Sequence, residues 1–182
     1  MPDLAAAWHF LEDSDLVASA QQVDDAIARL AQEISARLAK TYPVILAVMG
    51  GAIVFAGQLL PRLRFPMDFD YLHVTRYGAA TEGSRIEWRV APPAGVRGRP
   101  VLVLDDILDA GQTMRAIQEE VRALGAASFQ CAVLVEKMHA RPKPIRADFV
   151  GLEVEDRFVF GCGMDAKGFW RNLPEIRAMK GT

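Results

Sequence analysis

Hydrophobic residues follow two different periods along the chain. Between residues 24 and 38 they recur every three or four positions, which predicts a helix with one buried face. The run VILAVM at 44–49 is continuously apolar, which favours a strand covered on both faces. After a glycine pair, residues 52–63 are typical of a helix that closes near Pro61. The order helix, strand, glycine turn, helix is therefore expected.

The same alternation continues through the rest of the chain. Residues 67–75 and 86–90 predict two strands, and the polar, glycine-bearing residues 76–85 between them predict the tip of a flap. Residues 91–100 are a connector. Further strands are expected at 101–104, 128–137, 148–154 and 158–160, with a helix at 113–125. Repeated strand and helix pairs predict an α/β domain whose central, mostly parallel sheet is flanked by helices.

Composition narrows the classes of protein that fit this pattern. A chain of 182 residues that is 51% hydrophobic fits one globular domain. The net charge of -2 supplies no general basic field, so neither nucleic acid nor an anionic membrane is an expected partner. No membrane span or secretory signal is recognisable, which predicts a cytoplasmic protein. Cys131 and Cys162 lie far apart without further ligands at metal-binding spacing, which favours free thiols.

The stretch VLVLDDILDAGQT at 101–113 carries the clearest chemistry. Aliphatic residues lead into Asp105, Asp106 and Asp109, and a small turn follows. Ligands bind at the carboxyl edge of parallel sheets, and backbone N–H groups at the start of a helix bind anions. The carboxylates can accept hydrogen bonds from sugar hydroxyls or hold Mg²⁺. The simpler interpretation is a solvated acidic turn in which Asp109 caps the next helix.

This stretch resembles the ribose-phosphate signature of type I phosphoribosyltransferases. Nearly the whole chain, from about the first helix to FWRNL, is similar to the hypoxanthine-guanine phosphoribosyltransferases. VMGGAIVFAGQLL resembles their first phosphate-contacting loop, RYGAATEGS their mobile lid, and LVEK the strand with the lysine that reads the purine. DFVGLEVEDRFVFGCGMD resembles their base pocket.

The resemblance implies a type I phosphoribosyltransferase fold over residues 1–182 as a single domain. It places a core at about 41–152, a small hood at about 1–40 and 153–182, and a flexible lid at about 76–88. The implied reaction joins N9 of hypoxanthine or guanine to 5-phosphoribosyl 1-pyrophosphate, with Mg²⁺, giving IMP or GMP and pyrophosphate. A homo-oligomer, either a dimer or a tetramer, is implied as well.

The resemblance also assigns roles to individual residues. Asp109 would accept a proton from, or stabilise, the purine N7. Donor binding is implied for Asp105, Asp106, Ala110, Gly111, Gln112, Thr113, Gly50, Gly51 and Arg171. Base binding is implied for Lys137, Phe158, Val159 and Asp165, and metal contact for Asp105, Asp106 and Asp165. Taken alone, Lys137 fits an exposed strand end, Phe158 a core aromatic and Arg171 a surface salt bridge.

Three positions depart from the family pattern. Gly50 stands where a lysine is common, and Ala110 stands where a hydroxyl residue is frequent. In the lid, Arg76 precedes Tyr77 where serine is usual. Our hypothesis is that Arg76 brings positive charge onto the leaving pyrophosphate when the lid closes.

Three alternatives to a hypoxanthine-guanine enzyme stay open at this point. The first is a xanthine-preferring enzyme with the same donor loop. The second is a regulatory RNA-binding protein on the same fold, which should show a basic face. The third is a degenerate homologue that binds nucleotides without catalysis, a reading prompted by Gly50 and Ala110.

Overall fold

A computed structural model describes residues 3–77 and 85–181, with only the backbone for residues 76, 77 and 85. Its main sheet has six strands in the order β4-β3-β2-β5-β6-β7. All neighbouring strands are parallel except the antiparallel pair β3 and β4. The strands are β2 (Val44–Met49), β3 (Asp68–Tyr77), β4 (Arg85–Val90), β5 (Pro100–Leu108), β6 (Ser128–Met138) and β7 (Phe149–Glu155). The predicted α/β class and mostly parallel sheet are confirmed.

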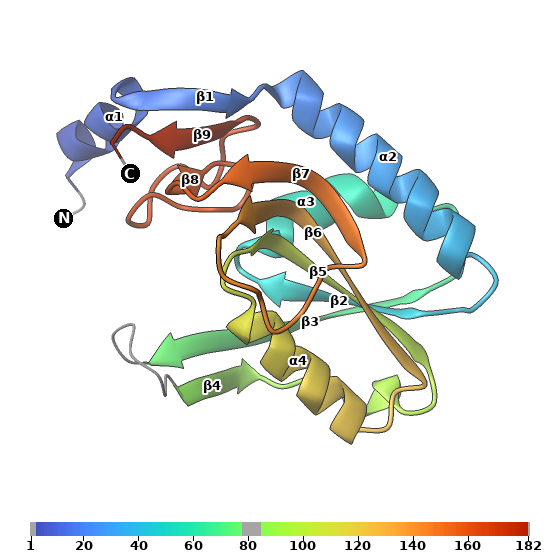
Figure 1. The fold of residues 1–182 in the computed structure, drawn as a ribbon. Coiled ribbons are helices and arrows are strands. Elements are labelled where there is room, and N and C mark those ends of the chain that lie inside the picture. The colour runs from blue at the N-terminus through green and yellow to red at the C-terminus, as the bar shows by residue number, and fades with distance from the viewer. Residues whose placement is uncertain (1–2, 78–84, 182) are drawn as a thin grey trace.

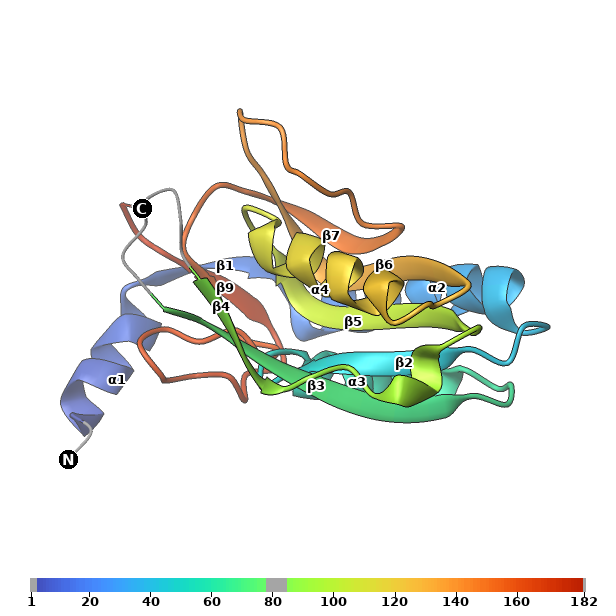
Figure 2. The same ribbon diagram turned by 90° about the horizontal axis from the view of Figure 1, so that it is seen from below.

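Helices cover both faces of this sheet (Figures 1 and 2). On one face lie α2 (Ala20–Leu38) and α3 (Ala52–Leu59), and α3 continues into a 3₁₀ turn, η1 (Leu60–Arg62). On the other face lies α4 (Gln112–Ala123). A second 3₁₀ turn, η2 (Ala94–Val96), belongs to the connector before β5. This layering follows from the sequence, since α2 and α4 each have one apolar face, α3 is mostly apolar, and the central strands are apolar on both faces.

A second sheet joins the two ends of the described chain. It has the order β1-β9-β8 and consists of β1 (Ser14–Ala18), β9 (Ile176–Met179) and β8 (Val159–Phe160). The short helix α1 (Leu4–Glu12) precedes β1. Figure 1 places this sheet beside the carboxyl ends of the parallel strands, above the edge where ligands bind in such folds. The sequence pattern had not predicted α1, β1 or β9.

Several boundaries differ from the sequence-based prediction. The strand expected at 101–104 runs to Leu108, so Asp105 and Asp106 lie within β5 and not in the turn after it. The helix expected from residue 24 begins at Ala20, because Ser19 and Gln22 form a capping box that starts it there. The prediction missed this first turn because it contains few apolar residues. This helix packs on β7 and β6 of the main sheet, although residues 1–40 were assigned to the hood. The flap strands reach Tyr77 and Arg85, which leaves a shorter loop than 76–85.

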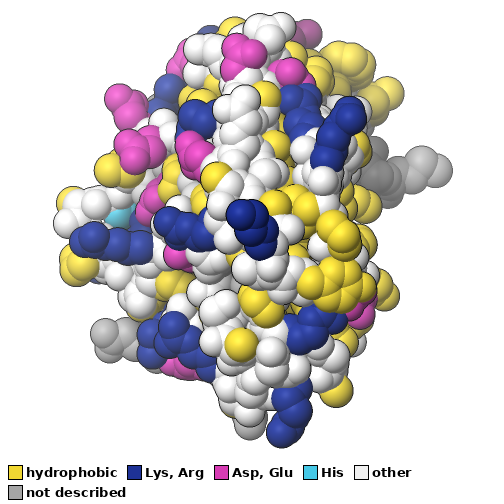
Figure 3. Space-filling view, turned by 90° about the vertical axis from the view of Figure 1, so that its right-hand side faces the viewer, with side chains coloured by type: hydrophobic (Ala, Val, Ile, Leu, Met, Phe, Trp, Pro, Cys, Tyr) yellow, Lys and Arg dark blue, Asp and Glu magenta, His cyan; other side chains and the backbone are white. Residues whose placement is uncertain are grey.

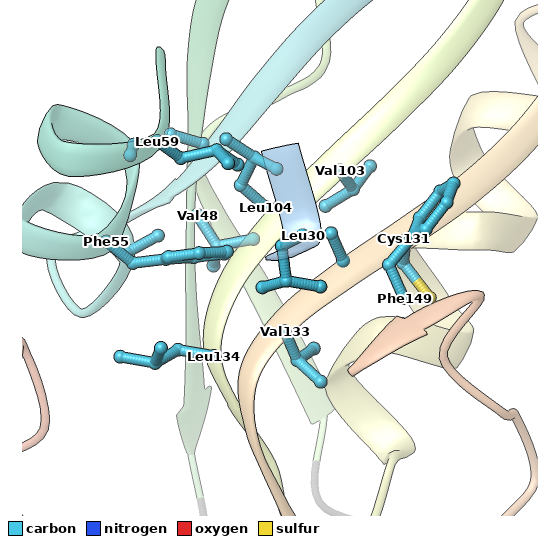
Figure 4. Packing of buried hydrophobic residues seen from close by; sticks show 14 of the residues in the cluster. Leu30, Val48, Phe55, Leu59, Val103, Leu104, Cys131, Val133, Leu134 and Phe149 are labelled. Atoms are coloured by element: carbon cyan, nitrogen blue, oxygen red, sulfur yellow. The ribbon is translucent and has the colours of Figure 1, made fainter. Parts of the chain in front are cut away.

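The core lies on both faces of the central strands, beneath α2 and α3 on one face and α4 on the other. Phe55 and Leu59 of α3 point toward the side chains of the main sheet, and Leu30 of α2 lies in the same layer (Figure 4). Phe55, Leu59 and Leu30 are fully buried. Both cysteines are free and buried, as predicted, and burial raises the pKa of each thiol to about 12.

The described helices include none that is long and apolar enough to cross a membrane. On the face drawn in Figure 3, basic and acidic side chains are interspersed over the surface. That face therefore presents no continuous basic area.

Truncation of Phe55 should destabilise the protein strongly, because its ring is fully buried. We expect Phe55→Ala to lower the free energy of unfolding in urea by about 3–5 kcal/mol, through lost burial and the cavity left behind. Ile53 lies on the same helix with a side chain that is 55% exposed, so Ile53→Ala is a matched control with little expected effect. Equal losses in the two variants would contradict this account of the core.

Candidate active site

A cavity of about 440 Å³, here called the first cavity, opens at the carboxyl ends of β2, β3 and β5. Several predicted donor residues line it together, although they come from different loops: Gly50, Gly51, Asp105, Asp106, Gly111, Thr113 and Arg171. Parallel strand pairing aligns the ends of these strands at one edge of the sheet. The sheet therefore brings together segments that are about 120 residues apart in sequence, as judged from Gly50 and Arg171.

Strand β5 carries two adjacent carboxylates into this cavity. Asp105 and Asp106 are only 9% and 8% exposed, the most buried acidic residues in the described chain. The Asp106 N–H donates to Asp105 Oδ1 at 3.0 Å. Burial raises the pKa of the Asp106 carboxyl, and hydrogen bonding to Asp105 and the positive charge of Arg171 offset this only in part. A buried carboxylate that is costly to ionise is a suitable ligand for a cation.

Two glycines allow the backbone to approach Asp106 closely. A Cβ atom on Gly51 would lie 2.0 Å from Asp106 Oδ2. A Cβ atom on Gly163 would lie 1.9 Å from the Gly51 carbonyl oxygen. The loop after β2, the end of β5 and the segment after β8 are therefore stacked at contact distance. No atom of the described chain lies within 4 Å of a Cβ built on Gly50, and the Met49–Gly50 peptide bond is cis.

The start of α4 faces the first cavity. Gly111 is its N-cap residue, and its φ of 79° lies in the left-handed region that favours glycine. No side chain caps the helix from this residue, so the first backbone N–H groups of α4 keep the geometry of an anion site. Gly111 and Thr113 line the cavity, whereas Ala110 and Gln112 line a neighbouring cavity of about 490 Å³.

A further cavity of about 510 Å³, the second cavity, adjoins the first through Asp106, Asp109 and Arg171. The predicted base-binding residues Lys137, Phe158, Val159 and Asp165 all line it. The Lys137 side chain is 13% exposed, so it is not the exposed strand-end lysine of the simpler interpretation. Phe158 is 44% exposed, so it is not a core aromatic, whereas Val159 is buried.

Charged groups converge between the second cavity and the neighbouring cavity of about 490 Å³. The Lys137 ammonium lies 3.6 Å from Asp109 Oδ1 and 3.8 Å from Asp156 Oδ1. His139 contacts the same two carboxylates at 2.8 Å through its two ring nitrogens. The Lys143 ammonium donates to the carbonyls of Leu108 and Lys137 and to Glu136, at 2.9, 2.6 and 3.0 Å. Lys143 thereby ties together the ends of the two strands that precede Asp109 and His139.

Arg171 forms the ion pair that the simpler interpretation predicted, with Asp165, and it also donates to the Gly163 carbonyl at 2.5 Å. Asp165 in turn accepts from the Gly168 N–H at 2.6 Å. Asp165 lines the second cavity and not the first, so the three predicted metal-contacting carboxylates do not share one cavity. Of these three carboxylates, Asp106 is the one that lines both cavities.

The lid lies partly outside the described residues. The backbones of Arg76 and Tyr77 end β3, but their side chains and residues 78–84 are not described. Sequence reasoning also missed residues that the structure brings to these cavities: His73, Thr75, His139, Lys143, Asp156, Met164 and Lys167. The one available signal was position, since His139 and Asp156 each lie two residues after the end of a predicted strand, at the edge of the sheet where ligands bind.

A protein-family model described as "Phosphoribosyl transferase domain" matches residues 14–167. A curated relative, "Hypoxanthine-guanine phosphoribosyltransferase" from Bacillus subtilis (strain 168), is 32% identical over 89% of this chain and 91% of its own length. The solved structure of a hypoxanthine-guanine phosphoribosyltransferase from Bacillus anthracis superimposes with a TM-score of 0.82 at 25% identity, over 90% of this chain and 95% of that one. A hypoxanthine-guanine-xanthine phosphoribosyltransferase structure matches with a TM-score of 0.77 at 27% identity, over 93% and 97%.

Gly51 should not tolerate a side chain, whereas its neighbour Gly50 should. We expect Gly51→Ala to lower the free energy of unfolding by about 1–3 kcal/mol, because its Cβ would overlap the Asp106 carboxylate. Gly50→Ala should stay within about 0.5 kcal/mol of the wild type, because open space surrounds that position. Urea unfolding of both variants tests whether Gly51 lies at contact distance from Asp106. A Gly51→Ala variant with an unchanged free energy of unfolding would contradict this contact.

Asp106→Asn should stabilise the ligand-free protein at alkaline pH. Since burial raises the pKa of this carboxyl, the native state holds its proton more tightly than the unfolded chain does. The cost of ionisation is absent below the ordinary carboxyl pKa and is complete above the raised one. We expect the variant to gain about 1 kcal/mol over the wild type at pH 8 and little at acidic pH. Urea unfolding across pH measures this difference, and an unchanged gap at all pH values would contradict it.

Proposed function

Because this chain belongs to the phosphoribosyl transferase family, we propose that it transfers the 5-phosphoribosyl group from 5-phosphoribosyl 1-pyrophosphate to N9 of hypoxanthine or guanine. The products are IMP or GMP and pyrophosphate. The protein is a phosphoribosyltransferase, and its relatives are named for these two bases. The proposal concerns the acceptor base and the residues that bind it.

The pairing of Lys137 with Asp109 is the observation that supports a 6-oxopurine. These two side chains lie 3.6 Å apart at the second cavity, with Phe158 beside them on the same lining. A 6-oxopurine presents O6 and N7 side by side on one edge, whereas adenine has a donor at position 6. An ammonium only donates and an ionised carboxylate only accepts. Lys137 therefore suits O6, and Asp109 suits a proton on N7.

The donor would occupy the first cavity. The uncapped N-terminus of α4, entered through Gly111, offers backbone N–H groups to the 5-phosphate, with Thr113 on the same lining. These donors belong to the backbone, so they do not require the hydroxyl that Ala110 lacks. Asp105 and Asp106 lie where they can accept from ribose hydroxyls. Arg171 lines both cavities, which suits a guanidinium that contacts the leaving pyrophosphate.

Catalysis on this surface would be mainly positioning and electrostatics. N9 attacks the anomeric carbon as the bond to pyrophosphate breaks, and positive charge develops on the ribose. The buried carboxylates on β5 lie on the lining of the donor cavity, where they can stabilise that charge. Asp109 receives or stabilises the N7 proton as electron density leaves the base. Closure of a lid that contains Arg76 would exclude water from the activated sugar.

The acidic side chains that line the first cavity fit Mg²⁺ as ligands. Asp105 and Asp106 offer oxygen ligands in the donor cavity, and burial makes the ionised Asp106 costly without a cation nearby. Bound Mg²⁺ would neutralise negative charge on the pyrophosphate group. Asp165 is the third proposed contact. Asp165 is already paired with Arg171, so its contact with the metal would be the least direct of the three.

The alternatives differ in what supports them. A preference for xanthine is supported by the printed name of one structural relative, which includes that base. A regulatory RNA-binding role has no support from the net charge of -2, and a non-catalytic homologue would have to retain this cavity lining without its reaction. A cytoplasmic location and a homo-oligomer, dimer or tetramer, are proposed on the family resemblance.

The proposed base preference is tested by product formation from four bases with the ribose donor and Mg²⁺. We expect turnover with hypoxanthine or guanine, and a kcat/KM for adenine that is lower by a factor of about 10⁴, since adenine would leave a buried cation facing a donor. Preferential use of xanthine would support the first alternative. Absence of product with every purine would overturn the enzymatic proposal.

Replacement of Lys137 separates recognition of the base from binding of the ribose donor. We expect Lys137→Gln to lower kcat/KM for hypoxanthine by about 10- to 100-fold, because a charged hydrogen bond to O6 is lost. The KM for the ribose donor should hold, since Lys137 lines only the second cavity. The amide can also accept, so discrimination against adenine should narrow. An unchanged ratio of hypoxanthine to adenine turnover would contradict the assignment.

A further inference from the structure

His139 forms a bridge that the reaction proposed above does not use. Its Nε2 lies 2.8 Å from Asp109 Oδ1, and its Nδ1 lies 2.8 Å from Asp156 Oδ2. The imidazole side chain is 19% exposed, whereas the two carboxylates are 51% and 56% exposed. The histidine is therefore the sheltered centre of a bridge between the loop after β5, the end of β6 and the segment after β7.

Among the described residues, the side-chain hydrogen bond and the ion pairs of Asp109 all use one oxygen. His139 and Lys137 both approach Oδ1, at 2.8 and 3.6 Å, and Oδ2 makes no hydrogen bond or ion pair with a described side chain. Asp109 lines both cavities. Fixing one oxygen of a carboxylate fixes the rotation of the group about its last bond. Oδ2 is then the oxygen left to meet a substrate.

The protons on His139 follow from its partners. Ionised carboxylates only accept, so both 2.8 Å contacts are hydrogen bonds when both ring nitrogens donate. Asp109, His139 and Asp156 also place potential ligand atoms within 4.8 Å of one another, as a metal site would. The Lys137 ammonium next to both carboxylates disfavours a second cation there. The arrangement fits a hydrogen-bonded clamp better than a metal centre.

We propose that His139 is a positioning residue for Asp109. Its Nε2–H holds Asp109 Oδ1, Asp156 fixes the ring from the opposite side, and Asp109 Oδ2 is thereby held toward the purine N7. This inference rests on the role proposed for Asp109 above. It adds a requirement for a hydrogen-bond donor at the Nε2 position of His139, which the family resemblance did not supply.

Two variants of the same residue test the requirement. The amide nitrogen of glutamine is as many bonds from Cα as Nε2 of histidine, and that of asparagine matches Nδ1. His139→Gln therefore keeps a donor for Asp109, and His139→Asn keeps one for Asp156. We expect the single-turnover rate with hypoxanthine to fall about 10- to 100-fold in His139→Asn and to stay within about threefold in His139→Gln. The KM for the ribose donor should hold in both.

Further measurements distinguish an effect on catalysis from a general loss of stability. The urea midpoints of both variants are compared with that of Met138→Ala, in which the altered side chain is adjacent and 55% exposed. Asp156→Ala should slow the reaction, and its effect should not add to that of His139→Asn, because both act through the same ring. Additive losses would count against the clamp.

The outcomes separate this inference from the proposed function. An inactive wild type overturns the proposed function before any variant is made. An active wild type with equal rates in the Gln and Asn variants, whether both normal or both impaired, overturns the role of His139. Rescue by Gln and not by Asn supports it.

Discussion

Close contact around the Asp106 carboxylate governs the geometry of the whole site. Gly51 leaves the space that this carboxylate fills, and Gly163 leaves the space that the Gly51 carbonyl fills. Three segments from distant parts of the chain therefore meet without a side chain between them. This stacking places Arg171, which follows Gly163, at the boundary between the two cavities. A methyl group at either glycine would push these segments apart.

Stability and binding are opposed at the same strand. The aliphatic half of β5 contributes fully buried residues to the core, and its last residues carry carboxylates into a site where ionisation is unfavourable. The ionised Asp106 carboxylate therefore lowers the stability of the ligand-free protein. Asp106 is only 8% exposed, so contact with water offsets little of this cost.

Much of the fold could be predicted because it depends on local pattern. The buried strands at 44–49 and 128–137 and the helix that follows Gly111 have strong periodicity, and the structure has them within a few residues of the expected bounds. The grouping of Lys137, Phe158 and Asp109 was found through a resemblance, since no local pattern pairs them. His139 and Asp156 were missed because their contact depends on the parallel register of β6 with β7. The strands β1 and β9 were missed because their short, mixed sequences gain a partner only in the folded chain.

The small sheet has a consequence for how the protein is made. Ser14 pairs with Met179, so the sheet that carries Val159 on β8 joins residues from both ends of the described chain. Contacts of such high sequence separation form late in folding, after the local helices and central strands. During synthesis Gly51, Asp106 and Gly111 of the first cavity emerge well before β9, whereas Arg171 of the same lining emerges only shortly before it. Both cavities are therefore complete only after Arg171, which lines each of them, has left the ribosome.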